Sequence, residues 1–193
     1  MLWIIISVII VVLDQVTKQA VVQNIDIGEK IPVIDQFFYL TLHMNPGAAW
    51  GVLQNGRVFF LIIVPIISAF LIYYMFKNKS KFLRFTLALI LAGAVGNYID
   101  RVFIGEVRDF LLFYIGTYPF PIFNVADISV TCGTIAMAVY VFFIYKEPEK
   151  EEKKGLEGKI EIEERKEQEE QSRESTDLMT KEQEKTEDAE RNL

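Results

Sequence analysis

Four long apolar stretches dominate the first three quarters of the chain. They consist mainly of Ile, Val, Leu and Phe and occupy residues 2–22, 58–76, 82–99 and 125–145. A helix that crosses a bilayer needs about 20 mostly apolar residues, so each stretch predicts a membrane-spanning helix. From residue 147 onward the chain is rich in Glu, Lys, Gln and Arg and has no apolar stripe wide enough for a core. We therefore expect a membrane domain over residues 1–146 and a charged tail over residues 147–193, either helical or disordered.

The segment between the first two stretches has a different pattern. Residues 30–35 and 37–44 are rich in β-branched and aromatic side chains, which is typical of strands. A turn is expected after them at Asn45-Pro46-Gly47. The predicted fold is an all-α core of four transmembrane helices with a small extracytoplasmic β-sheet.

Basic residues near the ends of the apolar stretches predict the orientation. Lys77, Lys79 and Lys81 lie in the turn between the second and third stretches, and the tail begins with Lys146. Lys and Arg are enriched on the cytoplasmic side, so both termini should be cytoplasmic and the two longer loops should lie outside. The first stretch lacks the basic start and the cleavage site of a signal peptide, so we expect it to be retained as a span.

Composition narrows the possible chemistry. The formal net charge of −6 comes mainly from the tail, so it does not indicate a basic or nucleic-acid partner of the folded part. Cys132 is the single cysteine, which rules out an intrachain disulfide, and the single histidine, His43, lies in a different segment. A thiol nucleophile usually needs such a partner. We expect no metal and no cofactor.

Acidic residues within the apolar part are few, and the predicted topology gathers four of them near the outer face: Asp14, Asp100, Asp109 and Asp127. Carboxylates are costly at membrane depth and usually have a function there. Asp14 lies four residues before Lys18, so the two can pair on one helix face in a structural role. Asp100 is predicted at a helix C-terminus, where it needs a cationic neighbour. Arg101 has the geometry to bind a phospholipid headgroup phosphate.

Asp109 and Asp127 fit a catalytic pair. Two close carboxylates share one proton, so that one takes a proton from water while the other donates to a carbonyl oxygen. Asn124 precedes Asp127 by three residues and can either orient a carboxylate or cap the last helix. Asp100 is the alternative to Asp109 as the second member of the pair.

Periodicity and charge leave the function open. A proton-coupled transporter or channel can use the same acids, although a transporter is expected to place them near the bilayer midplane. A scaffold protein whose charged tail binds a partner is a further alternative, and deletion of residues 147–193 would separate it from a peptidase.

Five sequence blocks occur in order and together resemble lipoprotein signal peptidase, also called signal peptidase II. They are DQVTK at 14–18, NPGAAWG at 45–51, GAVGNYIDR at 93–101, VRDF at 107–110 and FNVAD at 123–127. Small departures are Pro46, where Thr is frequent, and Ala92-Gly93, where a double glycine is common. The resemblance ends near Lys146 and does not include the tail.

The resemblance implies an aspartyl endopeptidase of the bacterial cytoplasmic membrane. It would remove signal peptides from prolipoproteins whose cysteine carries diacylglycerol, and the cyclic peptide globomycin would inhibit it. By motif, the catalytic pair falls on Asp109 and Asp127. The matching positions that shape the site are Asn45, Asn97, Asp100, Arg101 and Asn124, and those of the first-helix pair are Asp14 and Lys18.

Overall fold

The computed structural model describes residues 2–47, 56–145, 160–163 and 165–166. Internal contacts divide the chain into two units, residues 1–144 and 145–193. In the second unit, residues 160–163 are helical and exposed. The first unit carries the helices, the sheet and the site, and is described below.

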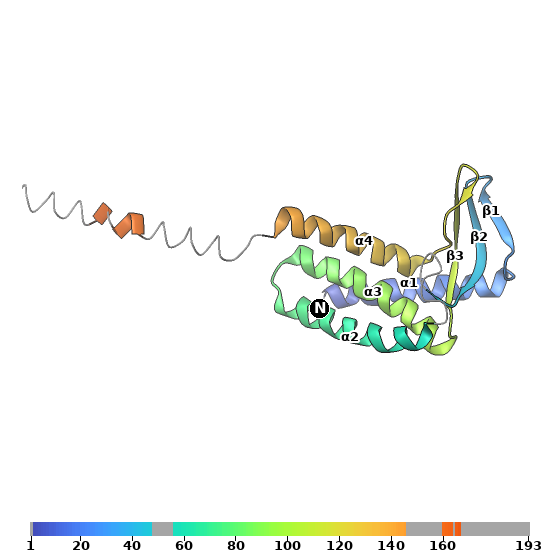
Figure 1. Ribbon diagram of the computed structural model, residues 1–193, viewed down its shortest axis with the longest axis horizontal. Coiled ribbons are helices and arrows are strands. Elements are labelled where there is room, and N and C mark those ends of the chain that lie inside the picture. The colour runs from blue at the N-terminus through green and yellow to red at the C-terminus, as the bar shows by residue number, and fades with distance from the viewer. Residues whose placement is uncertain (1, 48–55, 146–159, 164, 167–193) are drawn as a thin grey trace, which may run out of the picture. The chain divides into compact units, whose positions relative to one another are not determined.

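In the part of the chain that the structure describes, four helices are long and apolar enough to cross a membrane. They are α1 (Leu2–Asn24), α2 (Arg57–Lys77), α3 (Lys81–Phe103) and α4 (Val125–Val139), and α4 continues into a π-helical turn, Tyr140–Ile144. Helices α1, α2 and α4 each pack against α3, which is therefore the centre of the bundle (Figure 1). The four predicted spans are confirmed, and α3 runs four residues beyond its predicted end at Ile99.

The helices present apolar side chains on their outer surface as well as toward one another. In α2, Phe59, Ile62, Ile66 and Phe70 are all exposed. Of the most apolar 18-residue stretch of this helix, 6% is buried inside the protein. A helix that is apolar all round is typical of a membrane span, because lipid tails solvate such side chains as well as a protein core does.

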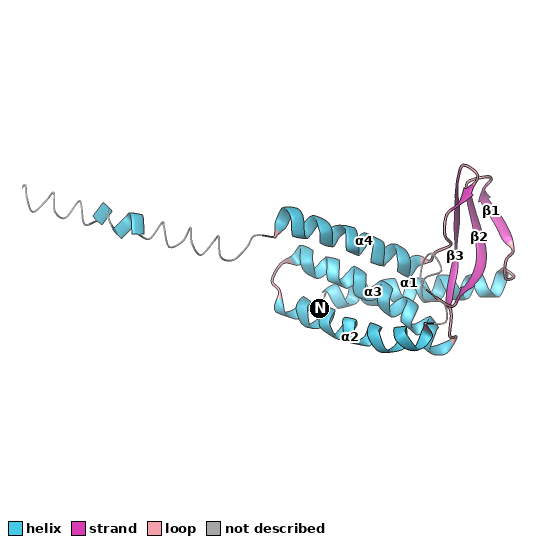
Figure 2. Cartoon of the chain, viewed as in Figure 1, coloured by secondary structure: helices cyan, strands magenta, loops and turns pink. Residues whose placement is uncertain are grey.

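A four-stranded antiparallel sheet lies at one end of the bundle, away from the turn that joins α2 to α3 (Figures 1 and 2). Its order is β1 (Lys30–Ile34), β2 (Phe38–Asn45), β3 (Val107–Ile115) and β4 (Tyr118–Pro119). The predicted small sheet and its first two strands are confirmed. Residues 100–124 were predicted to form an outer loop, and the structure instead pairs residues 107–115 of it with β2.

Two glycines on one side of α3 allow its neighbours to approach closely. A Cβ at Gly93 would collide with the carbonyl oxygen of Ala126 in α4, and one at Gly96 would lie 2.7 Å from Oδ2 of Asp14 in α1. Small residues at such contacts are typical of membrane helix packing. This close approach places polar groups of α1 and α4 at the same level along the axis of α3.

Candidate active site

Strand β3 directs Asp109 into the protein. The side chain is 2% exposed, and its two oxygens accept hydrogen bonds from the amide groups of Asn45, at 2.9 Å, and Asn124, at 2.6 Å. Successive strand residues point to opposite faces, so the neighbouring Arg108 faces away from Asp109. The pairing of β3 with β2 therefore decides which of these two residues reaches the site.

The first turn of α4 supplies Asp127. Asn124 is the N-cap residue, and its side chain accepts from the backbone N–H of Asp127, while Asp127 accepts in turn from the backbone N–H of Asn124 at 3.1 Å. This is a capping box, with an acid three residues after the cap. The other Asp127 oxygen accepts from the side-chain amide of Asn97 at 2.7 Å.

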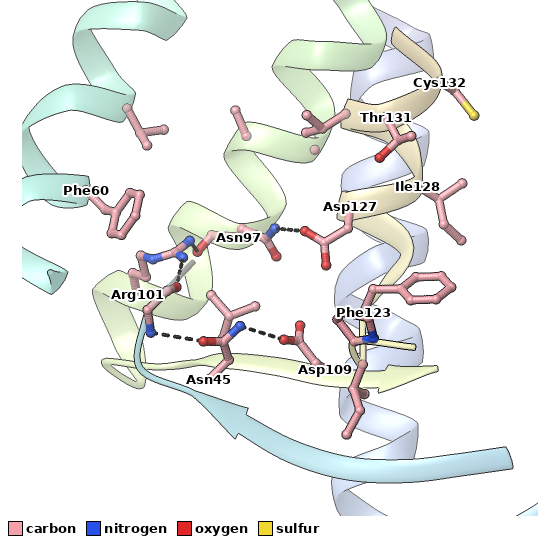
Figure 3. A pocket seen from close by; sticks show the side chains of 18 of the residues that line it. Asn45, Phe60, Asn97, Arg101, Asp109, Phe123, Asp127, Ile128, Thr131 and Cys132 are labelled. Carbon is pink, nitrogen blue, oxygen red and sulfur yellow. Dashed lines mark hydrogen bonds between the residues drawn. The ribbon is translucent and has the colours of Figure 1, made fainter. Parts of the chain in front are cut away.

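One amide network connects the two carboxylates. The Asn124 side chain donates to Asp109 and to Oδ1 of Asn97, and Asn97 donates its own Nδ2 to Asp127. Figure 3 shows Asp109 and Asp127 turned into the same space, Asp127 from α4 and Asp109 from β3. The structure thus brings together Asn45, Asn97, Asn124 and the two aspartates, which lie up to 82 positions apart in the sequence.

The surroundings of Asp109 favour its neutral form. Burial raises the pKa of Asp109 to about 7, and the nearby charge of Asp127 acts in the same direction. The hydrogen bonds from Asn45 and Asn124 and the charge of Lys18 oppose this rise. A carboxyl group that titrates near neutrality can hold a proton and release it during a reaction.

Asp100 lies outside this pair, in a buried cluster of charged side chains. It accepts from the guanidinium of Arg108 at 2.7 Å and from the Arg108 backbone N–H at 3.0 Å, and it pairs with Lys18 at 3.3 Å. The expected cationic neighbour is therefore present, although it is Arg108 and Lys18 rather than the adjacent Arg101. Asp100 lies in the last turn of α3, which ends at Phe103 rather than at the predicted Ile99.

Arg101 lies on the other side of α3, where it lines a cavity. Its guanidinium donates to the backbone oxygens of Gly47, at 2.7 Å, and Asn97, and lies 4.2 Å over the ring of Phe60. Arg57 in turn donates to the carbonyl oxygens of Arg101 and Val102. A contact between Arg101 and a phospholipid phosphate stays a prediction.

Asp14 and Lys18 form the predicted pair at 2.9 Å, and both side chains are fully buried. Asp14 also accepts from the backbone N–H of Ala126, at the start of α4. A carboxylate at a helix N-terminus is stabilised by the helix dipole and by the free N–H groups there. This bond ties α1 directly to the turn that carries Asp127.

A cavity of about 690 Å³ opens beside the two aspartates. Polar groups line one end, among them Asn45, Asn97 and Arg101. Ile128, Thr131 and Cys132 of α4 line the other (Figure 3). Val64, Gly93, Ala94 and Val130 also line the cavity. The cavity therefore extends from the carboxylates along α4 and has room for a peptide segment with apolar side chains.

Sequence reasoning missed several residues that support the site. Gln15 donates to Asp14, Asp100 and the Gly96 carbonyl oxygen, and accepts from Arg108. The spacing of Gln15 and Gln19 on α1 places both on one face, which was an available signal, and both contact Arg108. Nothing in the local sequence pointed to Arg57 or Phe60.

Among the residues that the structure describes, no group of three His, Cys, Asp or Glu side chains is arranged to hold a metal ion. The two aspartates stand among amide groups, which donate to carboxylates. A site that works without a metal or cofactor stays a prediction from the sequence.

The family model for signal peptidase (SPase) II matches residues 6–143. This chain belongs to the signal peptidase II family. The chain is 48% identical over 141 residues to a lipoprotein signal peptidase of Bacillus pumilus (strain SAFR-032), covering 72% of this chain and 91% of that protein. It is 47% identical over 147 residues to a lipoprotein signal peptidase of Geobacillus kaustophilus (strain HTA426), covering 75% and 95%.

Solved structures agree with this membership. Two structures described as bacterial membrane enzymes, solved by the in meso method, are 40% and 42% identical to the chain, with TM-scores of 0.69 and 0.68. They match 75% and 74% of this chain and 92% and 94% of their own lengths. A signal peptidase II family member with four apolar helices is a multi-pass membrane peptidase.

Proposed function

We propose that this protein is an aspartic endopeptidase that removes the signal peptide from diacylglyceryl-modified prolipoproteins, cutting just before the lipidated cysteine. The observation that carries this proposal is the Asn124 bridge, which holds Asp109 and Asp127 beside one cavity in a signal peptidase II family member. The relatives from Bacillus and Geobacillus are named lipoprotein signal peptidases, which supports the substrate class.

The proposed reaction needs one proton on the aspartate pair. The ionised carboxylate takes a proton from a water molecule, which attacks the scissile carbonyl carbon, and the protonated carboxyl donates to the carbonyl oxygen. The raised pKa of Asp109 supports a singly protonated pair near neutral pH, and the two groups titrate as a unit. Asn45, Asn97 and Asn124 fix both carboxyl planes, so little reorganisation is needed during the reaction.

The proposed orientation in the bacterial cytoplasmic membrane places the sheet and the aspartates at the outer face. The turn between α2 and α3, with Lys77 and Lys79, lies at the opposite end of the bundle from the sheet (Figure 1). Basic residues favour the cytoplasmic side, so both termini would be cytoplasmic. The signal-peptide helix would then enter from the lipid and lie in the apolar part of the cavity, beside Ile128 and Thr131.

A cleavage assay tests the substrate class. Purified protein is mixed with a precursor carrying diacylglyceryl-cysteine, or with the same precursor unmodified, and the products are identified by mass spectrometry. We expect one cut before the lipidated cysteine, little cleavage of the unmodified precursor, and inhibition by globomycin. Equal cleavage of both precursors, or of neither, contradicts the proposal.

The same purified protein, reconstituted in liposomes that contain a pH-sensitive dye, distinguishes the peptidase from a transporter or channel. A proton-coupled transporter or channel dissipates an imposed pH gradient, whereas the peptidase leaves the gradient intact. Deleting residues 147–193 addresses the scaffold alternative, and we expect this deletion to retain cleavage of the lipidated precursor.

A further inference from the structure

Seven charged groups gather around the candidate site in the part of the chain that the structure describes. All are buried except Asp127, which is half-buried, and they comprise four acids and three cations: Asp14, Asp100, Asp109, Asp127, Lys18, Arg101 and Arg108. Fully ionised, they carry one excess negative charge. A single proton on the Asp109–Asp127 pair makes the cluster neutral, which is the favourable state for charges removed from water.

The three cations have different positions relative to the pair. The Arg108 guanidinium is taken up by Asp100, Gln15 and Gln19, on the face of β3 opposite Asp109. Arg101 donates to backbone oxygens and lies over Phe60 at the cavity wall. Lys18 is fully buried; it pairs with Asp14 and Asp100, and it also hydrogen-bonds to Asn97.

Lys18 reaches the pair through a single side chain. Its ammonium donates to Oδ1 of Asn97 at 2.9 Å, and its remaining contacts are Asp14 at 2.9 Å and Asp100 at 3.3 Å. Because Asn97 Oδ1 accepts from both Lys18 and Asn124, its Nδ2 is left facing Asp127, to which it donates. Without the ammonium, only the Asn124 donor would hold the Asn97 amide in this orientation against the carboxylate.

We propose that Lys18, acting through Asn97, is a positioning residue that sets the charge state of the Asp109–Asp127 pair, beyond its structural pairing with Asp14. This inference rests on the function proposed above. Lys18 touches neither carboxylate of the pair, so its effect is electrostatic and orienting. The charge of Lys18 also lowers the pKa of Asp109, which agrees with this geometry.

Other ionisable groups lie around the same elements and are held constant in the test. His43 on β2 is exposed and lies in register opposite Asp109, Glu106 precedes β3, and Arg57 caps the end of α3 from α2. These groups are more exposed than Lys18, so solvent screens their charges more strongly.

The test compares pH profiles of kcat/KM for three variants on the lipidated precursor: Lys18→Met, Asp14→Asn and the double variant. A pair that works with one proton gives a bell-shaped profile. Loss of the Lys18 charge makes the carboxylates hold protons to higher pH. Both the acidic and the basic limb of the Lys18→Met pH profile therefore move to higher pH by about one unit. Loss of the Asp14 charge moves both limbs down, and the double variant lies between the single variants.

Asp14→Asn is close to isosteric and retains an oxygen that can accept from the Ala126 N–H, so it should fold. If Lys18→Met does not accumulate, the double variant is compared with Asp14→Asn instead, and limbs at higher pH in the double variant than in Asp14→Asn support the proposal. Opposite limb displacements support the proposal. A purely structural role for Lys18 lowers activity and melting temperature at every pH and leaves the limbs in place, and that result overturns the proposal.

Asp109→Asn, measured alongside, separates this inference from the proposed function. Normal cleavage by Asp109→Asn overturns the proposed function and the inference together. An inactive Asp109→Asn with unmoved limbs in the other variants overturns only the role of Lys18.

Discussion

Asn124 is the N-cap residue of α4, and its side-chain N–H also donates to Asp109 at 2.6 Å. A cap residue normally serves its own helix, by accepting from a backbone N–H in the first turn. Here the oxygen of the amide serves the helix and its nitrogen serves a carboxylate on a strand. The same residue therefore stabilises α4 and sets the distance between the two aspartates.

The two roles of Asn124 can be separated by comparing its replacement with the replacement of another N-cap residue that is far from the site. In Asn124→Ala both roles are lost, so we expect turnover to fall at least about 100-fold and stability to fall by about 1 kcal/mol. Ser80 caps α3 by accepting from the Leu83 N–H at the other end of the bundle, and Ser80→Ala should cost similar stability with unchanged turnover. Similar turnover in the two variants, measured by precursor cleavage, would contradict a role for Asn124 beyond capping.

The contact at Gly93 holds α4 against α3. In Gly93→Ala the added methyl group meets the Ala126 carbonyl oxygen and Val130, so α4 must move away and shift Asp127 relative to Asn97. We expect a loss of about 1–3 kcal/mol of stability and at least a tenfold loss of kcat.

Gly116→Ala is the matched control for this change. Gly116 has a positive φ of 63° and open space around its Cβ position, so the substitution strains the backbone by about 1–2 kcal/mol without touching the site. Its kcat should stay near the wild-type value. A Gly93→Ala enzyme with normal kcat would show that the α3–α4 spacing is not critical.

The helices and the first hairpin could be predicted because their signals are local. A span of about 20 apolar residues is complete within itself, and β1 and β2 adjoin in sequence. Strand β3 was missed because Phe110–Ile115 is a continuous apolar run without the alternation that marks a strand. Its partner β2 lies more than 60 residues earlier, so Asp109 was placed in a loop.

The residues that belong to the site were also easier to predict than the hydrogen bonds between them. The sequence blocks contain Asn45, Asn97 and Asn124, and the structure brings all three to the aspartates. Which amide donates to which carboxylate depends on the packing of α1, α3 and α4 around Gly93 and Gly96. The association of Arg108 with Asp100 depends likewise on the register of β3 and could not be read from adjacency.

Arg101 should contribute to substrate binding rather than to the fold of α3. In Arg101→Lys the planar contact with Phe60 and the bond to Gly47 are lost, because an ammonium cannot reproduce the guanidinium geometry. We expect kcat/KM to fall about tenfold or more, which corresponds to the loss of one hydrogen bond and one cation–π contact. Arg84→Lys, at the opposite end of α3, is the control and should behave as wild type. Equal kinetics in the two variants would remove Arg101 from the site.

The raised pKa of Asp109 predicts a pH-dependent stability. A carboxyl group whose pKa in the folded protein is about 7 binds more protons folded than unfolded between about pH 4 and 7. Its contribution to stability is therefore lost as the pH rises through this window. Asp109→Asn removes the titration, so its melting temperature relative to wild type should rise from pH 5 to pH 8, by the equivalent of about 2 kcal/mol.

Thermal unfolding in one detergent at several pH values measures this difference, with Asp35→Asn as the control. Asp35 is an exposed acid in the turn between β1 and β2, so Asp35→Asn controls for the loss of a carboxyl group outside the site. A difference between Asp109→Asn and wild type that does not change with pH would contradict the raised pKa of Asp109.

Cleavage of a diacylglyceryl-modified precursor by four single Asp→Asn variants decides whether Asp109 and Asp127 are the catalytic pair. We expect Asp109→Asn and Asp127→Asn to accumulate in the membrane and to be inactive, Asp35→Asn to cleave as wild type, and Asp100→Asn to lose stability but retain measurable cleavage. Wild-type turnover by either Asp109→Asn or Asp127→Asn would contradict the proposed aspartate pair.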